Sequence, residues 1–112
     1  MSVDILDWKE AISRVLNKRD LYGRLLQKFM DMERDSAARI AQALQQQDLE
    51  AARQIAHSVK GTSANLGAKA LAAAALELEM ALKGGGDTTL PLKHFEDALT
   101  DTLVAMTAFL SA

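Results

Sequence analysis

Apolar residues recur three or four positions apart along nearly the whole chain, which is the spacing of one face of an α-helix. Alanine and leucine together supply about a third of the 112 residues, whereas β-branched Val and Ile are scarce. Aromatic residues make up 4%, and Pro91 is the single proline. Strong helix formers with so few helix breakers predict an all-α domain with a core of Leu, Ala, Met and Ile.

Polar or glycine-containing segments divide this pattern into one short and four long predicted helices. We expect them at about residues 4–16, 20–44, 49–66, 68–83 and 88–110. Ser2 or Asp4 is the expected cap of the first helix, and Gly67 and the triple glycine at 84–86 are expected helix stops. Short connections between the long helices imply antiparallel neighbours. The sequence therefore predicts a single domain, residues 1–112. It is an up-down-up-down antiparallel four-helix bundle over about residues 18–111, capped by the short N-terminal helix.

Charge and composition exclude several classes of protein. Thirteen basic and fifteen acidic residues leave a formal net charge of −2, which argues against nucleic acid or an anionic membrane as the partner. The chain has no cysteine and two histidines, which excludes disulfides, thiolate zinc sites and three-histidine sites, and we expect no bound metal. No apolar run reaches the roughly 20 residues of a membrane span. Because a signal-peptide core is also missing, we expect a cytoplasmic protein.

An autonomous enzyme is disfavoured by the small size of the chain and by its motifs. The phosphate-binding patterns G-x-x-x-x-G-K-[ST] and G-x-G-x-x-G are missing, and the triple glycine at 84–86 lacks a following lysine and hydroxyl. The acidic residues are scattered and do not repeat the Glu-x-x-His pair of di-iron bundles. His57 is left as the candidate for chemistry.

His57 falls within the predicted helix at 49–66. At about 100° per residue its side chain points roughly 150° away from the apolar stripe of that helix, and so faces solvent. Lys60 and Gly61 follow one turn later, and Arg53 lies one turn earlier. An exposed glycine within a helix costs about 0.5–1 kcal/mol relative to alanine. Because this chain uses alanine freely, Gly61 indicates that a partner approaches the backbone closely.

The stretch of sequence that contains His57 has no acidic residue. From Ala51 to Leu76 there is no Asp or Glu, while Arg53, Lys60 and Lys69 are cationic. A neutral imidazole is a competent nucleophile near neutral pH, and a nearby ammonium neutralises charge on a transferring phosphoryl group. The residues themselves therefore indicate an exposed histidine that carries a phosphoryl group, beside a surface that attracts an acidic partner.

His94 also lies off the apolar stripe of its helix, by roughly 140°. Its neighbours Glu96 and Asp97 are acidic, and negative charge repels a phosphate. We therefore interpret His94 as an ordinary surface residue.

Residues 56–67, Ala-His-Ser-Val-Lys-Gly-Thr-Ser-Ala-Asn-Leu-Gly, resemble the motif of histidine-containing phosphotransfer (HPt) domains. That motif reads His, any residue, aliphatic, Lys, Gly and a small-residue run ending in aliphatic-Gly, and it matches throughout. The likeness extends over about residues 18–110. It implies a phosphorelay intermediate, which takes a phosphoryl group from the aspartate of one response-regulator receiver domain and passes it to another.

The resemblance also implies roles for individual residues. His57 would be phosphorylated on Nε2, and Lys60 would stabilise the charge of the phosphate. Gly61 would leave room for the incoming receiver, and small Ala64 would keep the docking surface flat. Arg53, on the same surface, is expected to contribute to docking.

Further expectations concern the imidazole, the cofactors and the partners. A polar residue of the next helix would orient the His57 ring, and the sequence leaves Glu77 and Glu79 both open for this role. The resemblance implies no ATP site, no kinase activity and no cofactor of the chain's own, since magnesium belongs to the receiver. A sensor or hybrid histidine kinase would act upstream, and we expect a monomer.

One alternative from another functional class is an adaptor bundle that binds a receiver or a partner helix but carries no phosphate. A relative of this kind needs no histidine, so His57 distinguishes the two hypotheses.

Overall fold

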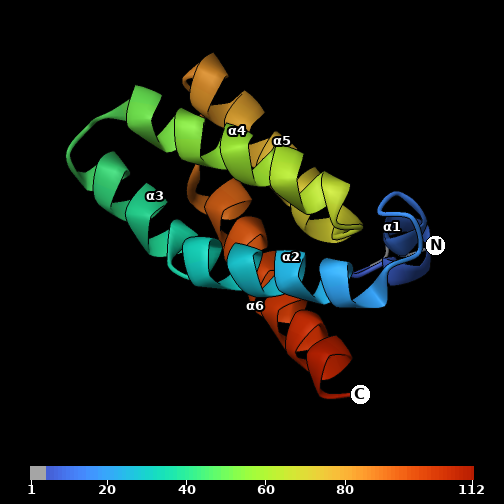
Figure 1. Cartoon of the computed structure of the whole chain (residues 1–112). Coiled ribbons are helices and arrows are strands. Elements are labelled where there is room, and N and C mark those ends of the chain that lie inside the picture. The colour runs from blue at the N-terminus through green and yellow to red at the C-terminus, as the bar shows by residue number, and fades with distance from the viewer. Residues whose placement is uncertain (1–4) are drawn as a thin grey trace.

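The computed structural model describes residues 5–112, and every regular element in that range is a helix (Figure 1). The helices are α1 (Trp8–Ser13), α2 (Arg19–Glu33), α3 (Ser36–Gln45), α4 (Leu49–Asn65), α5 (Lys69–Gly84) and α6 (Thr89–Ser111). Among these elements no helix combines the length and the apolar character that a membrane crossing requires. The predicted all-α class is confirmed.

The long helices form an up-down-up-down bundle in which α2 and α3 together make the first member (Figure 1). α4 runs back along α3, α5 reverses along α4, and α6 returns along α5. α6 also packs against α2 and α3, which closes the bundle. α1 lies at the end of the bundle that holds the turn between α4 and α5, where Asp7 N donates to Gly67 O at 2.8 Å.

The core is built from one face of each helix, and its burial fixes how each helix is rotated. Ala52, Ala56 and Val59 are all 0% exposed, so the face of α4 opposite to them must point outward. Composition predicted an aliphatic core, yet Tyr22 and Phe95 are among its most buried side chains. An aromatic ring buries 150–250 Å², so a few rings fill much of a small core.

The predicted helix at 20–44 is wrong in one respect, because the chain breaks between α2 and α3. Asp35 has φ −102° and ψ 10°, which lies outside the α-helical range. Arg39 stabilises the break, since its guanidinium donates to the Asp35 carboxylate at 3.1 Å and to the Met32 carbonyl at 3.2 Å. The apolar spacing continues through the break to the buried Ile40, so periodicity does not reveal it.

α1 is also shorter than the predicted helix at 4–16. Asp7 precedes it as the N-cap, and its carboxylate accepts a hydrogen bond from the third residue of the helix. The predicted caps Ser2 and Asp4 lie outside the described residues. Positions 16 and 17 have φ of 58° and 59°, and this left-handed backbone keeps the helix from reaching its predicted end.

Glycine ends α4 and α5, as predicted. Gly67 has φ +84° directly after the C-cap Leu66, and Gly85 has φ +69° as the C-cap of α5. The buried Tyr22 hydroxyl donates to the Leu66 carbonyl at 2.6 Å. This bond ties α2 to the end of the helix that bears His57.

Candidate functional site

His57 lies near the middle of α4, on its outward face. Its side chain is 61% exposed, whereas Ala56 and Val59 are fully buried on the opposite face. The predicted solvent orientation of His57 is confirmed. An imidazole in this position is open to a partner protein on one edge of the ring.

The other edge of the His57 ring is held by Glu79 of α5. His57 Nδ1 lies 2.8 Å from Glu79 Oε2, and the Glu79 side chain is 2% exposed. Because an ionised carboxylate can only accept, the proton between them belongs to Nδ1. The neutral imidazole then has its lone pair on Nε2, which is the nitrogen directed away from this contact.

Cations surround the buried carboxylate of Glu79. Lys60 Nζ donates to Glu79 Oε1 at 2.9 Å, and Arg53 Nη1 lies 3.6 Å from Oε2. Hydrogen bonds from Lys60 and His57 hold the pKa of Glu79 below its ordinary value, although burial acts in the opposite direction. Glu79 is thus a buried anion at neutral pH, and it fixes both His57 and Lys60.

Of Glu77 and Glu79, which the sequence left open, the helix phase of α5 brings Glu79 into contact with His57. Glu77 is 45% exposed and lies 2.8 Å from His94 Nδ1 instead of from His57. Glu79 falls in line with the buried Ala75 and Leu82. A glutamate in phase with an apolar stripe is the sequence signal that distinguishes the two residues.

The surface one turn beyond His57 has no large side chain. Gly61 is exposed, and a Cβ added there would meet no atom of the described chain within 4 Å outside its own helix backbone. Ala64 is exposed one turn further along α4. The packing of the domain itself therefore gives no reason for glycine at position 61.

The family model described as the Hpt domain matches residues 24–109. The chain belongs to the Hpt domain family. A search of curated proteins gave no match.

Two solved Hpt structures are similar to this chain over almost its full length. Histidine-containing phosphotransfer protein B (HptB) from Pseudomonas aeruginosa PAO1 is 28% identical, with a TM-score of 0.85 over 98% of this chain and 97% of that one. The Hpt domain of a sensor hybrid histidine kinase from Shewanella is 23% identical, with a TM-score of 0.84 and the same coverage. The second likeness concerns the fold alone.

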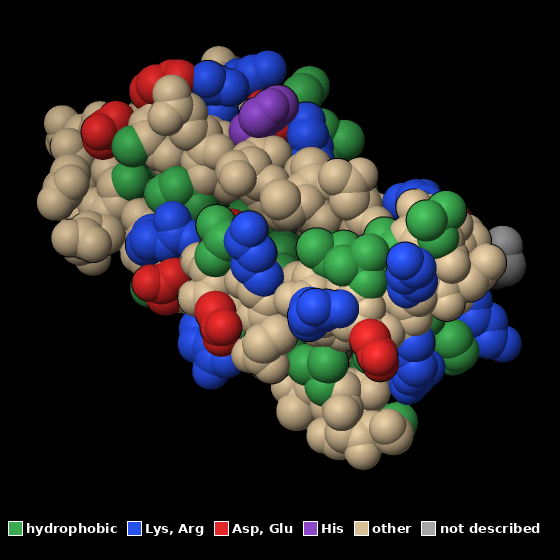
Figure 2. Space-filling model, viewed as in Figure 1, with side chains coloured by type: hydrophobic (Ala, Val, Ile, Leu, Met, Phe, Trp, Pro, Cys, Tyr) green, Lys and Arg blue, Asp and Glu red, His purple; other side chains and the backbone are tan. Residues whose placement is uncertain are grey.

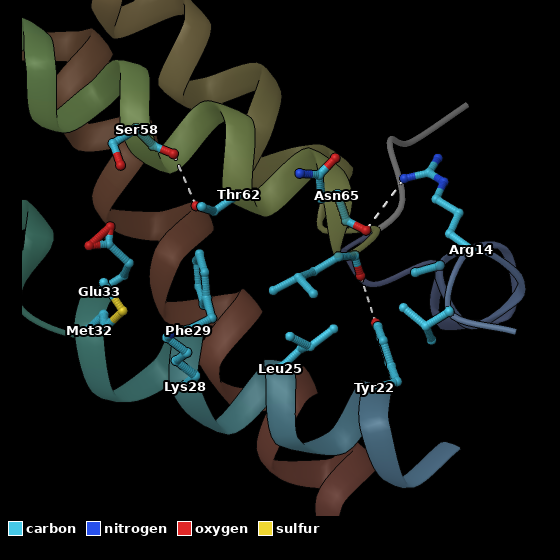
Figure 3. Close-up of a pocket in the computed structure, with 13 residues that line it drawn as sticks. Arg14, Tyr22, Leu25, Lys28, Phe29, Met32, Glu33, Ser58, Thr62 and Asn65 are labelled. Carbon is cyan, nitrogen blue, oxygen red and sulfur yellow. Dashed lines mark hydrogen bonds between the residues drawn. The ribbon is translucent and has the colours of Figure 1, made fainter. Parts of the chain in front are cut away.

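This Hpt domain also has an apolar cleft on the side of α4 that carries Ser58 and Thr62, and the sequence did not predict it. Figure 2 shows apolar side chains gathered in a hollow between α2 and α4, with Lys and Arg side chains around it. The cleft has a volume of about 520 Å³, with Tyr22, Leu25 and Phe29 on the α2 wall and Ser58 and Thr62 on the α4 wall (Figure 3). Leu25 is only half-buried and Met32 is exposed, so the α2 wall includes apolar side chains that the packing of the helices leaves uncovered.

Two other features bear on the chemistry of this domain. Within residues 5–112 no three His, Asp or Glu side chains lie close enough to hold a metal ion. His94 contacts Glu77 and is 46% exposed, so it lies on the surface as predicted.

Proposed function

We propose that this Hpt domain accepts a phosphoryl group on His57 Nε2 from the aspartate of a response-regulator receiver and passes it to another receiver aspartate. Membership of the Hpt family makes the chain a phosphorelay intermediate. The observation that supports His57 as the acceptor is its contact with Glu79, which holds the proton on Nδ1 and leaves Nε2 as the exposed nucleophile.

The transfer needs no proton movement within the Hpt domain. The Nε2 lone pair attacks the phosphorus of the receiver's aspartyl phosphate, and an N–P bond forms while the P–O bond to aspartate breaks. The electron pair of the broken bond returns to the receiver as a carboxylate. The imidazole, which keeps its Nδ1 proton, becomes positively charged beside the anionic Glu79. The same steps in reverse deliver the group to the next receiver.

In this proposal Lys60 binds the phosphoryl group, and the small residues of α4 make room for the receiver. The ammonium of Lys60 is one turn from His57 and 31% exposed, so it can neutralise a phosphoryl oxygen. No large side chain projects from Gly61 and Ala64, so the receiver backbone can approach His57 over this surface. Arg53 adds positive charge to this surface, and that charge attracts an acidic partner.

Hpt domains are phosphocarriers rather than kinases, and we propose that the ATP site and the magnesium belong to an upstream sensor or hybrid kinase and to the receiver. We also propose a cytoplasmic monomer, because the receiver must reach His57 from solvent. The adaptor alternative is not favoured, since it assigns no role to the buried carboxylate behind His57.

Labelling by a phosphorylated receiver tests the proposed function. The 112-residue chain should gain a phosphate that is labile in acid and stable in base, and His57→Gln should abolish it. His94→Gln is the matched control, because His94 has the same 2.8 Å contact between Nδ1 and a carboxylate but an acidic neighbourhood. Equal labelling of the His57→Gln variant, or loss of labelling in the His94→Gln variant, would show that the acceptor is wrongly assigned.

A further inference from the structure

Lys60 has two tasks that compete for one ammonium group. Its Nζ donates to Glu79 Oε1 at 2.9 Å, yet the proposed function needs the same group at the phosphoryl oxygens. Glu79 is 2% exposed with Lys60 in place, so the departure of Lys60 removes a charged hydrogen-bond donor from a covered carboxylate. A buried carboxylate that loses its cation is strongly destabilising unless another positive group takes its place. After transfer the His57 ring is positively charged, but its Nδ1 contacts Glu79 Oε2, whereas Lys60 contacted Oε1. A second cation beside Glu79 would replace the charge that Lys60 takes away.

Arg53 is the cation best placed for this. Its Nη1 lies 3.6 Å from Glu79 Oε2, which is an ion-pair distance but longer than a hydrogen bond. Its side chain is 27% exposed and lies on α4 one turn before His57. Glu50 holds the guanidinium from the solvent side, with Nε donating to Oε2 at 3.0 Å. The guanidinium thus has an exposed carboxylate on one side and the buried one on the other.

Lys83 is the other candidate, and the geometry disfavours it. Its Nζ lies 3.9 Å from Glu79 Oε2, at the limit of an ion pair, and its side chain is 56% exposed. An exposed lysine loses side-chain entropy when it is fixed, whereas the planar guanidinium of Arg53 is already oriented and its fork matches two carboxylate oxygens.

We propose that Arg53 is a positioning residue that takes over Glu79 when Lys60 turns to the phosphoryl group. This rests on the proposed function of His57. Before transfer, Lys60 pairs with Glu79, and Arg53 pairs mainly with Glu50. After transfer, Lys60 pairs with a phosphoryl oxygen, and Arg53 closes on Glu79. Arg53 acts on the phosphohistidine through Lys60, without touching the phosphoryl group.

The test measures the half-life of the phosphohistidine after labelling with phosphoramidate, a small donor that bypasses receiver docking. Arg53→Ala should shorten the half-life about two- to fivefold, which corresponds to one partly exposed ion pair. Lys60→Ala should shorten it in the same direction, and adding Arg53→Ala to Lys60→Ala should have no further effect. Arg53→Lys should recover part of the loss because it restores the charge.

Two controls separate this role from folding and from general charge. Arg24→Ala removes the same charge from α2, beside Gly23 and Leu110 and away from Glu79, and should leave the half-life unchanged. The unphosphorylated Arg53→Ala variant should keep its proton on His57 Nδ1, read from the ring ¹⁵N shifts, since Lys60 still holds Glu79.

Three outcomes would overturn the proposal. An unchanged half-life with slower labelling by a phosphorylated receiver would make Arg53 a docking residue only. Additive effects of the Arg53 and Lys60 variants would mean that Arg53 acts independently of Lys60. Wild-type protein that neither phosphoramidate nor any receiver labels would reject the proposed function as well, a result distinct from the first two.

Discussion

Glu79 Oε2 lies 2.8 Å from His57 Nδ1, and this contact joins a side chain that is 2% exposed to one that is 61% exposed. A buried acceptor on α5 thus sets the protonation of an exposed ring on α4. The edge of the ring that carries Nε2 is not held by Glu79, and it is the edge at which we propose that a receiver approaches. The same carboxylate also holds Lys60, so one buried side chain fixes the positions of both His57 and Lys60.

Replacing Glu79 should impair transfer far more than replacing Glu77. Glu79→Gln keeps an acceptor for His57 Nδ1 but removes the charge that stabilises the ring after transfer, and it leaves Lys60 without its carboxylate. Loss of a hydrogen bond to a charged group predicts a transfer rate lower by about 10- to 100-fold. Rapid-quench labelling by a phosphorylated receiver measures it. Glu77→Gln, on the same helix but facing His94, should transfer at the wild-type rate.

The stability of the domain should depend on acid pH through Glu79. Its folded pKa lies below the ordinary value of 4.5, chiefly because of the hydrogen bond from Lys60. The stability that the Glu79 charge adds to the fold is therefore complete above the pKa of Glu79 in the unfolded chain. It is lost as the pH falls through the pKa of Glu79 in the folded state, from about pH 5 downward. Urea unfolding across this pH range measures the free energy of unfolding of wild type and of Glu79→Gln. The difference between the two values should become smaller as the pH falls. A difference in the free energy of unfolding that stays constant with pH would mean that the Glu79 charge does not stabilise the fold.

Helix phase explains what could be predicted of the site and what could not. The outward direction of His57 follows from the apolar stripe of a single helix, so counting residues was sufficient. The partner of His57 depends on how α4 and α5 pack together, and this relation is set by the tertiary fold rather than by either helix. The helix break at Asp35 could not be predicted for a similar reason. The side chain of Arg39 stabilises the break, while the apolar spacing continues through it.

Gly61 should lower the stability of the domain and favour docking of the receiver. A Cβ there meets open space within the described chain, so Gly61→Ala should raise the free energy of unfolding by about 0.5–1 kcal/mol. The larger Gly61→Arg should slow labelling by a phosphorylated receiver but leave labelling by phosphoramidate unchanged, since only the receiver must approach the backbone. Thermal unfolding and the two labelling rates test this. Equal receiver rates for wild type and Gly61→Arg would contradict the close approach.

Tyr22 should make the domain sensitive to alkali. Burial raises the pKa of Tyr22 to about 12 from 10.0, so the folded state favours the neutral phenol. The stability it adds is complete below about pH 10 and is lost as pH rises toward about 12. Tyr22→Phe removes the donor to the Leu66 carbonyl and should cost about 1–2 kcal/mol at neutral pH. Unfolding curves should show this difference shrinking above about pH 10, and a constant difference would contradict the assignment.

Gly67 and Gly85 share a left-handed backbone but should differ in their tolerance of a side chain. Gly85 has φ +69° with open space around it, so Gly85→Ala should cost about 1–2 kcal/mol from backbone strain alone. At Gly67, with φ +84°, a Cβ would also lie 2.4 Å from the Asp7 carbonyl oxygen, and Gly67→Ala should cost at least about 3 kcal/mol. Because backbone cannot yield as a flexible side chain does, α1 must move away in Gly67→Ala.

Trp8, the single tryptophan, packs on Phe109 with 5.6 Å between ring centroids, so its fluorescence reports whether α1 is docked. Gly67→Ala should shift the Trp8 emission while Gly85→Ala leaves it unchanged, and an unshifted spectrum with wild-type stability in Gly67→Ala would contradict the contact.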